Sequence, residues 1–280
     1  MNGPAVLIEP AELADLMSAG IAWVPADVRW SLTGPPGRAD FEQAHLPGAH
    51  WVDLDHELAG PPGLGGRHPL PEPAAFGAAM RRIGVRPEVP VVAYDGATSL
   101  AAARLWWLLI DAGHPHVRVL NGGLAAWLAS GGATESGPAA DAEPGTFSPR
   151  PGQRAQLQAT EIVHALTGPE PPELVDVRAP ERFSGASEPM DPVAGHIPGA
   201  VNRPSMRHLD ESGRFLPAAE LETQFADLEA PVFYCGSGIT AAHSLLALEA
   251  TGRTGAIYPG SWSDWISDPT RPVSAGPDGP

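Results

Sequence analysis

The sequence is poor in cysteine, in basic residues and in long apolar runs. Its 280 residues include one cysteine, Cys235, which excludes an internal disulfide framework and any paired-cysteine metal site. Lys and Arg number 17 against 33 Asp and Glu, so the net charge is −16, and a surface this acidic disfavours contact with nucleic-acid phosphates. The longest apolar run, Leu105 to Ile110, is too short to cross a bilayer, and the first residues lack the basic start of a secretory signal. We therefore expect a cytoplasmic protein with no nucleic-acid or membrane partner and no metal or organic cofactor.

Four short blocks occur twice in the chain, in the same order. Such a repeat is the mark of a tandem duplication. The paired blocks are Asp27-Val28-Arg29 with Asp176-Val177-Arg178, His45-Leu46-Pro47-Gly48-Ala49 with His196-Ile197-Pro198-Gly199-Ala200, Val91 to Gly96 with Pro231 to Gly236, and Gly122 to Trp127 with Gly260 to Trp265.

The repeat divides the chain into two domains of ordinary size. Residues 131–154 are rich in Gly, Pro, Ser and Ala and show no apolar periodicity, which is typical of a linker. We predict a first domain over residues 1–132, a linker over 133–154 and a second domain over 155–280.

Apolar runs alternate with helical patterns in each half. In the second half, Glu173 to Val177 and Pro231 to Tyr234 are typical of buried parallel strands, and Ala241 to Thr251 of a helix closed by Gly252. Helices are also predicted over residues 160–166 and 217–228. This alternation predicts an α/β fold, with a mostly parallel sheet flanked by helices in each domain, and chemistry in the loops that follow the strands.

Cys235 follows one of these strands and is followed at once by glycines and a helix. Gly236 and Gly238 permit backbone conformations that would turn successive N–H groups inward, and the helix start adds a positive dipole end. Such a loop would stabilise a negative sulfur species. A small buried side chain is the alternative interpretation of a lone cysteine.

Two chemistries fit a cysteine at a strand-to-helix turn. Phosphate-ester hydrolysis would place an arginine six residues after the cysteine, but that position is Ala241. The other is sulfur transfer, in which the cysteine carries a sulfane sulfur as a persulfide.

The ordered set of motifs resembles the tandem-domain rhodanese-type sulfurtransferases. The resemblance is carried by Asp-Val-Arg, His-Ile-Pro-Gly-Ala, Cys-Gly-Ser-Gly-Ile-Thr and Gly-Ser-Trp-Ser-Asp-Trp. It implies two rhodanese-like domains, of which the second is catalytic through Cys235. The first is degenerate, because Asp95 stands at the position of the nucleophile. The resemblance also implies that the loop residues Gly236, Gly238, Ile239 and Thr240 take part in substrate binding.

The loop sequence is similar to that of 3-mercaptopyruvate sulfurtransferases. The resemblance implies that Ser237 works with His68 and Asp55, with Asp53 as the competitor of Asp55, and that Arg182 binds the donor. It also implies a second arginine within Glu-Pro-Arg, where this chain has Met190; Arg203 or Arg207 could replace it. 3-Mercaptopyruvate is therefore the first predicted donor and thiosulfate the second.

The predicted acceptor is cyanide, a small thiol or a dithiol protein. Two other hypotheses remain open at this point. One is a persulfide carrier or sensor that acts on a protein partner and turns over poorly. The other is a scaffold in which Cys235 is unreactive.

Overall fold

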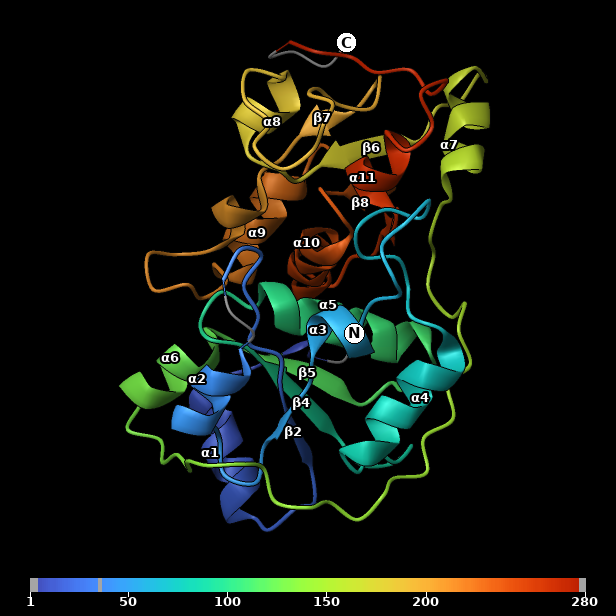
Figure 1. Cartoon of the computed structure of the whole chain (residues 1–280). Helices are drawn as coiled ribbons and strands as arrows, with labels where there is room; N and C mark the ends of the chain where they lie inside the picture. The colour runs from blue at the N-terminus through green and yellow to red at the C-terminus, as the bar shows by residue number, and fades with distance from the viewer. Residues whose placement is uncertain (1–4, 35–36, 277–280) are drawn as a thin grey trace. The chain divides into compact units, whose positions relative to one another are not determined.

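Two compact units make up the computed structural model, which describes residues 5–34 and 37–276 (Figure 1). The first unit comprises Met1–Gly60, Pro71–Gln153 and Leu209–Phe215, and the second comprises Pro61–Leu70, Arg154–His208 and Leu216–Pro280. Each unit therefore includes a short segment that lies, in sequence, within the other.

The first unit is built on a five-stranded parallel sheet in the order β1-β5-β4-β2-β3. The central strands β2, β4 and β5 lie side by side in Figure 1, and α5 packs against β4 and β5. The strands are β1 (Leu7–Ile8), β2 (Val24–Asp27), β3 (His50–Trp51), β4 (Val91–Tyr94) and β5 (Val117–Leu120), and the helices are α1 (Pro10–Ser18), α2 (Arg38–Gln43), α3 (Leu54–Glu57), α4 (Pro73–Arg82), α5 (Leu100–Asp111) and α6 (Gly123–Ala129).

The second unit repeats this topology with a four-stranded parallel sheet in the order β7-β6-β8-β9. A parallel bridge from Gln156 to Ile257 of β9 takes the place that β1 has beside β5. Its elements are α7 (Ala159–Leu166), β6 (Glu173–Asp176), α8 (Pro180–Ser184), β7 (Val201–Asn202), the 3-10 helix η1 (Ser205–His208), α9 (Ala218–Phe225), β8 (Pro231–Tyr234), α10 (Ile239–Ala250), β9 (Ala256–Ile257) and α11 (Ser261–Trp265).

These elements confirm the predicted α/β architecture, with small shifts at their ends. The predicted strand from Glu173 ends one residue earlier than expected, and the predicted helix over 217–228 ends at Phe225. The helix predicted from Ala241 begins at Ile239, because the loop after Cys235 enters the helix directly. Gly252, with a φ of +84°, follows its C-cap as predicted.

Each unit has its own apolar core around the sheet. The first core includes Phe41, Tyr94 and Trp127, and the second includes Phe183, Tyr234 and Trp262. Trp262 and Trp265 have no exposed surface and belong to the second core. Two pairs of positions in the repeated blocks, Tyr94 with Tyr234 and Trp127 with Trp265, are therefore core positions in both units.

The repeated Asp-Val-Arg blocks tie down the strand ends in both units. Arg178 donates to both carboxylate oxygens of Asp176 and to the Gly195 carbonyl at 2.6 Å. Arg29 donates in the same way to Asp27, and to the Ala44 carbonyl at 2.6 Å. Because the first copy has Asp95 in place of the cysteine and keeps the same bonds, the shared pattern indicates a structural role for these ion pairs.

The predicted linker segment, residues 133–154, contains no helix or strand. Its backbone is bonded to the first unit at several points: Glu135 pairs with His45, Gly145 donates to Arg81, and Gln153 donates to Asp111. Across the described residues, the helices are too short or too polar to cross a membrane.

Candidate active site in the second unit

Cys235 lies directly after β8, at the carboxyl end of the strand, and is 2% exposed. Its backbone N–H donates to Ser261 Oγ at 3.1 Å, and its carbonyl accepts from the Trp262 N–H at 3.0 Å. Carboxyl ends of parallel strands gather at one edge of the sheet, where loops can carry reactive groups. The cysteine is thus fixed by its own backbone at the edge where chemistry is expected.

The loop that follows Cys235 turns the chain from β8 into α10. Gly238 is the N-cap residue of α10 and has a φ of +85°, a conformation that residues with a side chain avoid. In this turn the Gly238 N–H donates to Cys235 Sγ at 3.1 Å. Ile239 and Thr240 form the first turn of the 12-residue helix, whose positive dipole end lies at the same place. A negative sulfur here meets a hydrogen-bond donor and a helix N-terminus.

Ser261 is a functional candidate that sequence reasoning missed. Its hydroxyl oxygen lies 3.9 Å from Cys235 Sγ and 3.1 Å from the Cys235 backbone nitrogen, and the side chain is fully buried. Ser261 also has a φ of +54°, which is unusual for a residue other than glycine. The available signal was the second copy of the fourth repeated block, which begins at Gly260 and includes Ser261.

Ser237 and His68 are brought together, although 169 positions separate them in sequence. The Ser237 hydroxyl oxygen and His68 Nδ1 are 2.8 Å apart, and Ser237 is 6% exposed. The contact lies within the second unit, because that unit includes Pro61–Leu70. A buried hydroxyl bonded to an imidazole can give or take a proton through that imidazole.

Asp55 and Asp53 lie in the first unit, at the start of α3. Asp55 Oδ1 accepts from the Trp30 indole N–H at 2.9 Å. Asp53 is the N-cap of α3: its carboxylate accepts from the Asp55 N–H at 3.1 Å and bonds His56 Nδ1 at 2.9 Å. The role of Asp55 beside His68 stays a prediction.

Arg182 is held by two buried carboxylates. Its Nε donates to both oxygens of Glu188 at 2.9 Å, and its Nη2 donates to Asp191 Oδ2 at 2.9 Å. Burial opposes ionisation of Glu188, but the bonds from Arg182 and from the Met190 and Asp191 backbone N–H groups outweigh it and lower the pKa of Glu188. The guanidinium is therefore fixed in orientation.

Arg67 is a second guanidinium beside the loop, and sequence reasoning did not propose it. Its Nη1 is bonded to Asp191, the same carboxylate that holds Arg182. A Cβ placed on Gly236 would lie 3.0 Å from Arg67 Nη2 and 3.4 Å from Arg182 Nη1, so both side chains approach the residue after Cys235. Of the candidates considered before, Arg203 pairs with Asp227 at 2.6 Å and Arg207 lies in η1.

A known family matches both halves of the chain. The model of the rhodanese-like domain matches residues 9–130 and again residues 159–268. The chain belongs to the rhodanese family. It carries the domain in two tandem copies, which confirms the predicted resemblance and the predicted fold.

Several relatives of the chain are named as sulfurtransferases. The chain is 44% identical to "Putative thiosulfate sulfurtransferase SseB" of Mycobacterium tuberculosis, over 97% of both chains. It is 42% identical to "Probable 3-mercaptopyruvate sulfurtransferase" of Pseudomonas aeruginosa, over 89% of this chain and 91% of that one. The structure of a 3-mercaptopyruvate sulfurtransferase from Leishmania major matches with a TM-score of 0.81 and 32% identity, over 93% of this chain and 74% of that one. The prediction of a sulfurtransferase is confirmed.

The first rhodanese copy carries a carboxylate in the matching loop. The Asp95 side chain accepts from the backbone N–H groups of Ala97 (3.1 Å), Ser99 (2.9 Å), Ala101 (3.1 Å) and Ala102 (3.4 Å). Burial raises the pKa of Asp95, and these bonds oppose the rise. The loop of the first copy thus surrounds its own carboxyl group, which supports the prediction that this copy is inactive.

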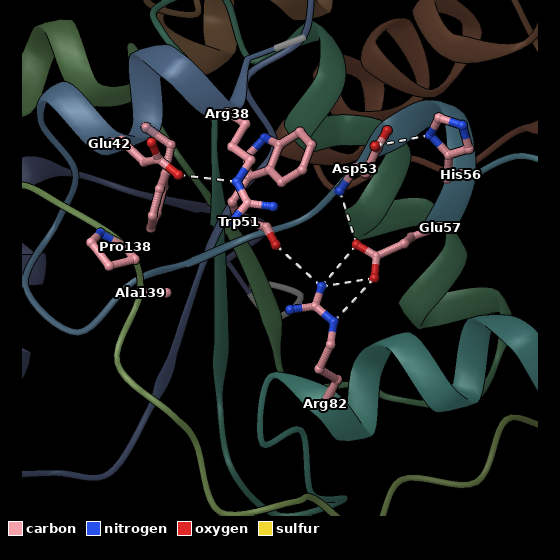
Figure 2. A pocket seen from close by; sticks show the side chains of 10 residues that line it. Arg38, Glu42, Trp51, Asp53, His56, Glu57, Arg82, Pro138 and Ala139 are labelled. Carbon is pink, nitrogen blue, oxygen red and sulfur yellow. Dashed lines mark hydrogen bonds and ion pairs between the residues drawn. The ribbon is translucent and has the colours of Figure 1, made fainter.

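The first copy also has a surface cavity of about 400 Å³, lined by α2, β3, α3 and α4 side chains (Figure 2). Figure 2 shows its charged groups bonded to one another: Arg82 to Glu57 at 2.7 Å and Arg38 to Glu42 at 3.0 Å. Apart from Asp53, the cavity contains no residue of the predicted site. Its described lining residues include no cysteine, serine or threonine.

Proposed function

We propose that this rhodanese moves a sulfane sulfur from a small donor to an acceptor through a persulfide on Cys235. The observation that carries the proposal is the Cys235 sulfur itself, held at the end of β8 with the Gly238 N–H bonded to it at 3.1 Å. The same N–H and the start of α10 would stabilise the charge of the persulfide. Relatives named as sulfurtransferases support this assignment.

The first half-reaction is a displacement at sulfur. The Cys235 thiolate attacks the donor sulfur, forming the new S–S bond as the bond from that sulfur to the rest of the donor breaks. With 3-mercaptopyruvate the broken bond is C–S, and the enolate that leaves takes up a proton to become pyruvate. With thiosulfate the broken bond is S–S, and sulfite leaves with its electron pair.

The pair of Ser237 and His68 favours 3-mercaptopyruvate as the donor. An enolate leaving group needs a proton, and the Ser237 hydroxyl, bonded to His68 Nδ1 at 2.8 Å, can supply or relay it. Sulfite needs no such proton. We propose Ser237 and His68 as catalytic residues, Asp55 as the partner predicted for His68, and Arg182 as a donor-binding residue.

Thiosulfate is the second candidate, and the guanidiniums favour it. The loop has no cationic side chain of its own, but Arg182 and Arg67 both approach Gly236 from outside the loop. A compact dianion gains more from such a pair than a monocarboxylate does. The absence of charge within the loop therefore does not by itself exclude this donor.

For the second half-reaction we propose cyanide, a small thiol or a reduced dithiol protein as the acceptor, with the cytoplasm as the location. A persulfide carrier that serves one protein partner would show the same loading with slow release to small acceptors. The rate of sulfur release to a small thiol separates the two.

The deciding experiment is the mass of the intact protein after brief exposure to each donor and removal of the excess. We expect the addition of one sulfur atom to the wild-type chain, and none to Cys235→Ser, whose side chain is nearly isosteric. Loading mainly from 3-mercaptopyruvate would support the first donor, and loading mainly from thiosulfate the second. Absence of loading from both, or full sulfur transfer by Cys235→Ser, would overturn the proposed function.

A further inference from the structure

We infer that Arg67 is a donor-binding residue, which together with Arg182 forms a paired guanidinium site for the anionic group of the donor. The inference rests on the proposed function and assigns a group to it that the sequence patterns did not point to. All 17 basic residues of the chain are arginine, so its permanent side-chain cations are all planar guanidiniums.

Asp191 joins the two arginines. Its side chain is 3% exposed; Oδ1 accepts from Arg67 Nη1, and Oδ2 accepts from Arg182 Nη2 at 2.9 Å. One buried carboxylate thus fixes the distance and the relative orientation of two cations. Because Glu188 binds the Nε side of Arg182, that guanidinium is held on two sides.

The remaining terminal nitrogens of both arginines face the catalytic loop. Arg67 Nη2 would lie 3.0 Å, and Arg182 Nη1 3.4 Å, from a Cβ added to Gly236. Among residues 5–34 and 37–276, neither of these two nitrogens donates to an acceptor, and Arg67 Nε is buried without one. Two donors that converge beside Cys235 match a carboxylate, or the sulfonate-like end of thiosulfate, which accepts from two guanidiniums at once.

The backbone around Arg67 is fixed to the same loop. Ser263 accepts from the Arg67 N–H through its Oγ at 3.0 Å, and its own N–H donates to the Gly236 carbonyl at 2.9 Å. Gly66, with a φ of +94°, allows this approach, since a Cβ there would lie 2.6 Å from Ser263 Oγ and 2.9 Å from the Gly260 carbonyl. The backbone of Arg67 is therefore linked, through Ser263, to Gly236, the residue that follows Cys235.

The test measures sulfur loading as a function of donor concentration, by intact mass, for Arg67→Met, Arg67→Lys and the wild type. For Arg67→Met we expect the half-saturating concentration of either donor to rise about tenfold or more, with little change in the rate at saturation. Arg67→Lys keeps the charge but loses the planar pair of donors, so its half-saturating concentration should lie between those of the wild type and Arg67→Met. Arg86→Met is the matched control, because Arg86 pairs with the exposed Glu143 in the first unit.

The outcomes separate this inference from the proposed function. A wild-type chain that takes up no sulfur would overturn the function and the inference together. If the wild type loads sulfur and Arg67→Met has the same half-saturating donor concentration, the inference alone is overturned. If Arg67→Met does not fold, Arg67→Lys and Gly236→Ala decide: a Cβ at position 236 displaces Arg67 Nη2, and an unchanged half-saturating concentration in both variants would contradict the assignment.

Discussion

At the scale of single residues, Ser237 and His68 separate the two donors. Ser237→Ala removes the hydroxyl that we assign to protonation of the pyruvate enolate. We expect kcat/KM for 3-mercaptopyruvate to fall roughly 100-fold, a typical loss for a general acid–base group, with a much smaller loss for thiosulfate. His68→Asn should show the same pattern. Equal losses with both donors would mean that Ser237 only shapes the turn.

His208 makes the stability of the second unit sensitive to acid. The ring is 2% exposed, with Nδ1 2.7 Å from Gln224 Oε1 and Nε2 3.2 Å from Ser244 Oγ, and burial lowers its pKa from 6.5 to about 4. Between pH 4 and pH 6.5, His208 is therefore largely protonated in the unfolded chain and largely neutral in the folded chain. Stability is fully present above pH 6.5 and is lost as the pH falls towards 4, by about 3 kcal/mol in total.

The measurement is urea unfolding of the wild type and of His208→Asn at several pH values. The asparagine amide can still donate towards Gln224 but does not titrate, so the variant should be less stable at pH 7 and lose less stability on acidification. His50 and His114, whose pKa values burial also lowers, are present in both proteins and cancel in the comparison. Parallel pH dependence in the two proteins would show that His208 is not the group responsible.

At the scale of elements, the two ends of α10 offer a matched pair of glycines. Gly238 and Gly252 both have a φ near +85°, at the N-cap and just beyond the C-cap of the same helix. An alanine at either position costs roughly 1–2 kcal/mol of stability, because a side chain is strained there. Only Gly238 donates its N–H to Cys235 Sγ, so Gly238→Ala should also slow sulfur loading, whereas Gly252→Ala should not.

Thermal unfolding and intact-mass loading of both variants check this prediction. Comparable losses of stability with a loading defect confined to Gly238→Ala are expected. A loading defect of the same size in Gly252→Ala would mean that the helix as a whole, and not the geometry of the loop, controls the reaction.

The elements themselves were largely predictable from the sequence. An apolar run predicted strand β8, and a helical period after two glycines predicted helix α10. These signals lie within the elements themselves and do not depend on contacts with distant residues. The loop around Cys235 was predictable for the same reason. Arg67 and Ser261 were not predictable, because their roles depend on contacts between residues far apart in the sequence. The neighbour of Arg67, His68, contacts Ser237 across a sequence separation of 169, and Ser261 contacts Cys235 across a separation of 26.

At the scale of the whole molecule, the two copies show what the duplication kept and what it changed. Both keep the strand order, the Asp–Arg pair at the strand end and a Tyr hydroxyl that accepts from the backbone of the His-x-Pro-Gly turn: Tyr94 from Leu46 and Tyr234 from Ile197, each at 3.1 Å. They differ at the loop: in the first copy its N–H groups donate to the Asp95 side chain, and in the second the Gly238 N–H donates to the Cys235 sulfur. The repeated motifs predicted the structure that the two copies share. The residues that differ between the copies, Asp95 and Cys235, lie where we assign the reaction.

The exchange of short segments between the units has an evolutionary consequence. Residues Pro61–Leu70, encoded within the first copy, belong to the second compact unit and bring Arg67 and His68 to it. On our assignment, a gene rearrangement that discarded the first copy would keep the nucleophile and lose the groups that hold the donor and move its proton. Ten residues would then keep the first copy under selection, although Asp95 stands in it at the position of the nucleophile.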